Sequence, residues 1–184
     1  MQYLRIGGEM VSQKAKAAGA KKLHERRIDL RNSLWNGEDG IETKKLWIRN
    51  KHDGYTTLPR TFPYIARIMD RESGKGTPLS GTYLALWSNV FDECFLEIKE
   101  KKRYAFESGF SGERSVTTWT NRMRKLEELG FIESRNGTEG EFNYVLIINP
   151  LEVCKVLCQG KENDELFNSL IARMSSVGAK FENE

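Results

Sequence analysis

The side chains of this chain that are best suited to recognise a ligand share one face of the segment 115–129. They are hydroxyl, amide and guanidinium groups, which donate hydrogen bonds to the edges of nucleic-acid bases, and Asn and Arg can do so in bidentate fashion. The same face carries no carboxylate in its first three turns, because Glu127 and Glu128 come only near its end. The predicted base-contacting residues are Thr117, Thr118, Asn121 and Arg122. The alternative is an ordinary amphipathic helix whose charged face is merely solvated.

A second set of residues around this face is predicted to bind phosphate groups, which fix orientation without reading sequence. Positive charge is concentrated there, although the whole chain carries only +3. Residues 99–125 hold eight Lys and Arg against three Glu, and residues 1–60 hold thirteen against seven carboxylates. If these cations lie together in space, they would neutralise phosphates and release counterions, which supplies affinity for nucleic acid that does not depend on sequence. The alternative is that charges clustered in the sequence are scattered over a solvated surface. The predicted phosphate-contacting residues are Lys101, Lys102, Arg103, Arg114, Ser115, Lys125 and Arg135.

These residues must be positioned by two helices joined by a tight turn. In the segment 115–129 the apolar residues recur every three or four positions, at Val116, Trp119, Met123, Leu126 and Leu129, which predicts a helix with one buried face. Upstream, the small Ala105 suits a helix crossing, and Gly109 suits the end of a preceding helix because glycine tolerates positive φ.

A β-hairpin is predicted immediately after the second helix. Gly130 ends the helix, residues 131–135 and 141–148 have strand character, and the tip at 136–140 contains Asn136-Gly137, a strong hairpin signal. Segments 79–91 and 95–98 fit a preceding helix and a short strand.

The order of these elements over residues 79–149 resembles the winged helix-turn-helix superfamily. The resemblance implies binding of double-stranded DNA, with helix 115–129 in the major groove, and a homodimer acting on two-fold sites. The layout is similar to winged helix proteins of plasmids and other mobile elements, which favours a transcriptional regulator or a replication or partition factor without separating the two. One feature departs from the pattern, because the tip carries Glu139 and Glu141 against a single Arg135, so the wing either avoids DNA or serves a protein contact.

The expected fold class is α+β and mainly helical, with a winged helix-turn-helix core, an N-terminal basic helical arm and C-terminal helices. The arm is expected to span 1–40, with a helix over 10–34, and either to lie along DNA or to pack against a second subunit. Residues 41–78 are expected to form a small hairpin (45–49 and 55–58) and a helix packed on the core. The winged helix domain is expected to span 79–150. Residues 151–184 are expected to form helices that pack on the core or support dimerisation.

Several classes of function are not expected. The chain has no apolar run long enough to cross a membrane and no secretion signal, and its three cysteines suit a reducing cytoplasm. Its two histidines and three cysteines lack zinc-ligand spacing, and no catalytic motif appears, so we expect no metal, no cofactor and no enzyme. The main alternative to DNA binding is a winged helix protein–protein interaction module in a larger nucleoprotein or defence complex.

Overall fold

A computed structural model describes residues 13–35, 40, 45–161 and 163–182 of the chain. Its contacts divide the chain into two compact units, residues 1–54 and 55–184. The first unit contains helix α1 (Gln13–Leu34) and a 3-10 turn at Arg49–Lys51. Residues 10–12 of the predicted arm helix lie outside the described residues.

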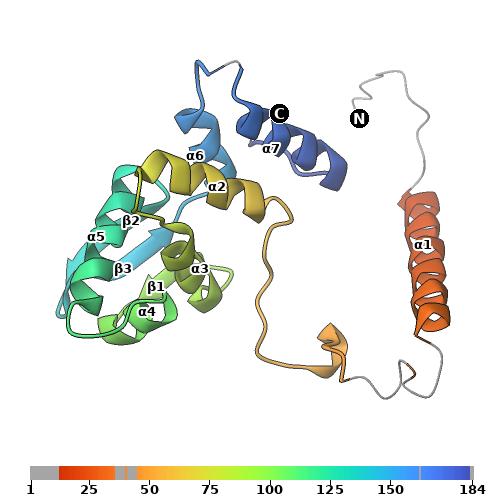
Figure 1. The fold of residues 1–184 in the computed structure, drawn as a ribbon, viewed down its shortest axis with the longest axis horizontal. Coiled ribbons are helices and arrows are strands. Elements are labelled where there is room, and N and C mark those ends of the chain that lie inside the picture. The colour runs from red at the N-terminus through yellow and green to blue at the C-terminus, as the bar shows by residue number, and fades with distance from the viewer. Residues whose placement is uncertain (1–12, 36–39, 41–44, 162, 183–184) are drawn as a thin grey trace, which may run out of the picture. The chain divides into compact units, whose positions relative to one another are not determined.

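The second unit holds six helices and a three-stranded sheet among its described residues (Figure 1). The expectation of a mixed α+β, mainly helical protein is therefore confirmed. The elements, in chain order, are α2 (Phe62–Ser73), α3 (Ser80–Asn89), β1 (Phe95–Glu97), α4 (Lys101–Glu107), α5 (Ser115–Glu128), β2 (Ile132–Gly137), β3 (Gly140–Ile147), α6 (Pro150–Leu157) and α7 (Glu165–Val177).

The sheet is antiparallel, with strand order β1-β3-β2. Phe95 of β1 and Ile132 of β2 pair with Leu146 and Ile147 of β3. The turn between β2 and β3 is Thr138-Glu139, which lies within the predicted tip at 136–140, although Asn136 and Gly137 belong to strand β2.

The hairpin is irregular near this turn, where its register shifts between Arg135 and Gly137. Phe142 has a φ of 59°, and it is buried together with the next residue, Asn143, which breaks the usual alternation of a strand. A Cβ at Gly137 would overlap the Asn143 side chain, and this explains why the glycine lies within the strand.

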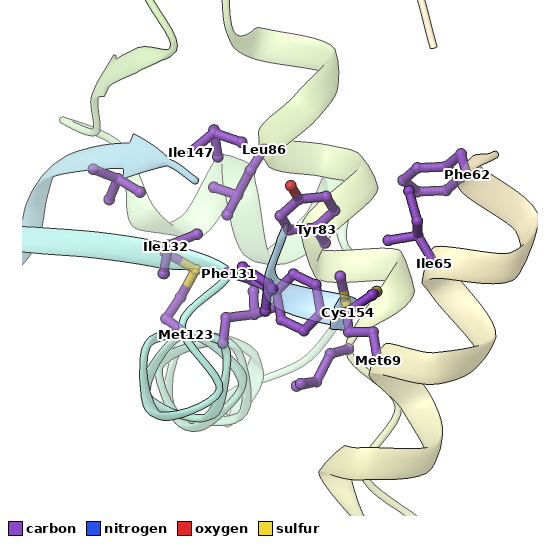
Figure 2. Close-up of a cluster of buried hydrophobic side chains, with 14 of the residues drawn as sticks. Phe62, Ile65, Met69, Tyr83, Leu86, Met123, Phe131, Ile132, Ile147 and Cys154 are labelled. Carbon is purple, nitrogen blue, oxygen red and sulfur yellow. The ribbon is translucent and has the colours of Figure 1, made fainter. Parts of the chain in front are cut away.

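A single hydrophobic core joins all the elements of this unit, and Figure 2 shows part of it. Trp119, Met123 and Leu126 of α5 are fully buried, as the periodicity predicts. Tyr83 of α3 lies edge-on to Phe131, with ring centroids 5.7 Å apart. Helix α2 contributes Phe62, Ile65, Ile68 and Met69, and α6 contributes Val153 and Cys154.

The C-terminal helices pack onto this same core. Leu170 and Met174 of α7 are buried in it, and Asp164 caps the helix by accepting hydrogen bonds from the Leu166 and Phe167 amides. The Asp164 carboxylate also pairs with Arg71 of α2 at 2.7 Å. Four of the five residues of the predicted apolar stripe therefore pack on the core, whereas Ile171 is exposed, and a role in dimerisation stays a prediction.

The prediction of a hairpin at 45–58 is wrong. This stretch contains the 3-10 turn but no strand, and an isolated two-stranded hairpin is only marginally stable in water. The boundaries predicted at 40, 78 and 150 stay predictions. No helix in the described part of the chain combines the length and the apolar character that a membrane span requires.

Candidate nucleic-acid interface

The turn between α4 and α5 is fixed by backbone hydrogen bonds at the end of α4. Gly109 adopts a φ of 87°, and its amide donates to the carbonyl of Phe106, while the Phe110 amide donates to the carbonyl of Ala105. This paired arrangement is a Schellman motif, which satisfies the last carbonyls of a helix. Ala105 itself is fully buried, as its predicted place at the helix crossing requires.

The end of α5 repeats this arrangement and leads directly into the sheet. Gly130, with a φ of 83°, donates to Glu127, and the Phe131 amide donates to Leu126. The Glu127 carboxylate also accepts hydrogen bonds from the amide and the hydroxyl of Ser134 at 2.8 and 2.7 Å. The C-terminal turn of α5 therefore holds this helix to β2. The buried face of α5 then fixes which of its side chains point into solvent.

The side of α5 that faces solvent carries a continuous row of polar residues, which we call the α5 row. Spacings of three and four residues place them on one narrow strip of the helix, and each is exposed. The row contains no carboxylate until its last member. It consists of Arg114, Thr117, Asn121, Arg124 and Glu128.

Two of the four predicted base-contacting residues, Thr117 and Asn121, belong to the α5 row. Thr118 lies at its margin and is partly buried. Arg122 lies near the core instead: its guanidinium carbon is 5.8 Å from the centre of the Phe110 ring, and its Nη2 donates to the Gly76 carbonyl at 3.4 Å. Arg122 is thus engaged by its own domain, whereas Asn121 projects into solvent.

Two of the residues predicted to bind phosphate, Lys102 and Arg114, remain open to a ligand. Both are exposed, and neither makes an ion pair with any residue that the structure describes. Lys125 is partly buried and pairs with Glu128 at 2.6 Å. Ser115 is buried in the first turn of α5, with 7% of its surface exposed.

The other three predicted phosphate-binding residues are engaged by neighbouring groups. Lys101 donates from Nζ to the carbonyl oxygen of Glu139 at 2.8 Å and so holds the tip of the β2–β3 hairpin. Arg103 pairs with Glu107 at 2.8 Å. Arg135 lies 3.7 Å from Glu133 on its own strand. The partner of Lys101 had no signal in the sequence, because it is a distant backbone atom, whereas the i,i+4 spacing of Arg103 and Glu107 could have indicated that pair.

Arg124 is a member of the α5 row that the residue-by-residue prediction missed. Its Nη2 lies 2.8 Å from Oε1 and 3.1 Å from Oε2 of Glu141, and its Nη1 donates to Oδ1 of Asn121 at 3.1 Å. The helical spacing from Thr117 and Asn121 would have placed Arg124 in the row. Its pairing with Glu141 depends on the hairpin and had no signal in the sequence.

Among the described residues, Cys154, His24 and His52 form neither a reactive thiol nor a metal site. Burial raises the pKa of the Cys154 thiol to about 12, so this thiol is not a reactive thiolate. His24 and His52 are both exposed, and within the described ranges no group of three His, Cys, Asp or Glu side chains could hold a metal ion.

Comparisons of the chain with protein-family models, with curated proteins and with solved structures found no match.

Proposed function

We propose that residues 79–149 form a winged helix domain and that the protein binds double-stranded DNA through the α5 row. The observation that carries the proposal is the exposed polar strip on a helix whose opposite face is locked into the core. Arg114, Thr117, Asn121 and Arg124 offer guanidinium, hydroxyl and amide donors within four turns of helix. Such groups suit the base edges and phosphates that line a major groove.

The connectivity of the unit supports the same proposal. From α3 to β3 the order is helix, strand, helix, helix and two hairpin strands, and β1 pairs with β3. This order is that of winged helix domains, in which the helix before the hairpin enters the groove. Exposed Lys102 in α4 and Arg114 at the start of α5 would contact phosphates.

A homodimer is part of the proposal, since two-fold DNA sites need two copies of such a domain. Repression of transcription and a role in plasmid replication or partition are both compatible with a DNA-binding dimer. Selection of a preferred site from a randomised pool of duplexes, followed by a search for that site near promoters or replication origins, would separate the two.

The direct test is fluorescence anisotropy of the full chain with a labelled random-sequence duplex at about 50 and 200 mM salt. We expect micromolar affinity that falls steeply with salt, because non-specific binding to DNA is mainly release of counterions. Absence of binding at the lower salt concentration would reject the proposal.

A protein-interaction module is the second candidate, and exposed aromatic side chains favour it. Phe91 and Phe106 leave 77% and 74% of their surfaces in solvent. A contiguous exposed apolar patch marks a partner-binding site, and this candidate requires that both side chains belong to one such patch. If duplex DNA does not bind, a pull-down that fails with Phe106→Ser would support this candidate instead.

A further inference from the structure

An ion pair spans the α5 row and the β2–β3 hairpin. The Glu141 carboxylate receives the Arg124 guanidinium with Nη2–Oε1 and Nη2–Oε2 distances of 2.8 and 3.1 Å, and Nε lies 3.3 Å from Oε2. Both side chains remain open to solvent, at 57% for Arg124 and 41% for Glu141. A carboxylate thus covers one of the cations of a surface that otherwise offers donors to an anion.

The backbone of the hairpin explains why Glu141 reaches α5. Phe142 has positive φ, which costs roughly 1–2 kcal/mol for a residue with a side chain, and its ring packs edge-on against Trp119 at 6.2 Å. This burial compensates the strained conformation and fixes the position of the preceding residue. Lys101 holds the adjacent tip through the Glu139 carbonyl, so the carboxylate of Glu141 is presented to Arg124 by a supported loop.

An exposed ion pair of this kind is weak enough to be exchanged. Pairs between solvent-accessible side chains contribute about 0–1 kcal/mol, and a phosphate offers the guanidinium the same bidentate geometry as a carboxylate. Arg124 lies one helical turn beyond Asn121 in the exposed row, where a duplex seated on α5 would bring its backbone near.

We propose that Arg124 is a phosphate-binding residue of this surface and that Glu141 competes with the DNA phosphate for its guanidinium. This inference rests on the proposed function. In the free protein Glu141 holds Arg124 against the hairpin. On DNA the guanidinium transfers to a phosphate, and the affinity is lowered because the ion pair with Glu141 must be broken first. Glu141 therefore limits non-specific binding, which every phosphate of the genome would otherwise support.

The test is a double-mutant cycle in duplex binding, measured by anisotropy on the full-length protein at several salt concentrations. We expect Glu141→Gln to bind a random duplex about twofold to fivefold more tightly at 50 mM salt, the range expected for release of an exposed ion pair. Arg124→Ala should weaken binding and make the slope of log K against log salt shallower by about one. In the Arg124→Ala background, Glu141→Gln should raise the affinity no more than the loss of another exposed carboxylate at the same tip does.

Glu139→Gln is the matched control for a general loss of negative charge, because Glu139 is an exposed carboxylate at the same tip that makes no side-chain ion pair with a described residue. An equal gain from Glu139→Gln and Glu141→Gln, or a gain from Glu141→Gln that persists in the Arg124→Ala background, would overturn the competition. If neither the unmodified protein nor any variant binds duplex DNA, the proposed function itself fails. Urea unfolding of each variant would verify that all are folded.

Discussion

Replacing Asp164 with Asn should isolate the ion pair that joins the C-terminal helices to α2. Asp164 has two structural roles: it caps α7 through the Leu166 and Phe167 amides, and its carboxylate receives Arg71 with Nη1–Oδ1 and Nη2–Oδ2 distances of 2.8 and 2.7 Å. Asn caps helices about as well as Asp, so Asp164→Asn keeps the first role and removes the second.

The magnitude follows from the exposure of the two partners. Hydrogen bonds to a charged group contribute about 1.5–3 kcal/mol, but 37% of the Arg71 side chain faces solvent, which screens the pair. We therefore expect Asp164→Asn to lower the free energy of unfolding by about 1–2 kcal/mol at pH 7. Asp164→Ala should cost about 1 kcal/mol more, because it also removes the cap.

The penalty should depend on pH in a defined direction. The hydrogen bond from Arg71 holds the pKa of the Asp164 carboxyl well below its usual range, whereas in the unfolded chain the pKa is about 3.9. The unfolded state therefore binds a proton first as the pH falls. The stabilisation is fully present above the unfolded pKa and is lost progressively toward the lower folded pKa.

Urea unfolding followed by tryptophan fluorescence would measure both effects. The difference between the unmodified protein and Asp164→Asn should be largest at pH 7 and should shrink as the pH falls from about 5 toward 2. Asp92→Asn, which changes an exposed carboxylate in a loop, is the control and should leave the midpoint unchanged at pH 7. A penalty of the same size at pH 7 and at pH 3 would refute the ion-pair account of Asp164.

Three further outcomes can be checked with the same materials. Asn121→Ala should reduce discrimination between a selected site and random DNA by about 1–3 kcal/mol. Lys102→Ala should instead weaken binding to all duplexes alike and make the slope of log K against log salt shallower by about one. Equal behaviour of the two variants in anisotropy would contradict these roles. Trp119→Ala should lower the free energy of unfolding by about 3–5 kcal/mol, because the side chain is fully buried. A change in the urea midpoint equivalent to less than about 1 kcal/mol would show that neighbouring side chains fill the space it leaves. Gly137→Ala should destabilise the hairpin, because the added Cβ overlaps the Asn143 side chain. Faster amide hydrogen exchange in β2 and β3 would reveal this loss, whereas unchanged protection would show that Asn143 moves aside.

The helices of the second unit could be predicted from the sequence because their signals are local. The apolar spacing of 115–129 fixes which side of α5 is buried, and Gly109 and Gly130 mark the ends of α4 and α5 because both adopt positive φ. The same periodicity placed Thr117 and Asn121 on the exposed side. These features depend on residues within one or two helical turns, so the sequence alone determined them.

What surrounds those side chains depended on the tertiary structure. Arg122 was expected to face a ligand, but its position near the edge of the buried face brings it to Phe110 and Gly76. The wrong prediction of a hairpin at 45–58 has a related cause, because strand pairing depends on what the strands pack against.

The clearest contrast is between Asn121 and Arg124. Helical spacing determined that both face solvent, but only the folded hairpin brings Glu141 to Arg124, across 17 residues of sequence. That contact requires positive φ at Phe142, burial of its ring against Trp119 and support of the tip by Lys101. The sequence by itself determined which side of α5 is buried and which faces solvent, because that depends on local spacing. The tertiary structure decided that Arg124 is already paired with a carboxylate, because Glu141 becomes its neighbour only when the sheet packs on the helix.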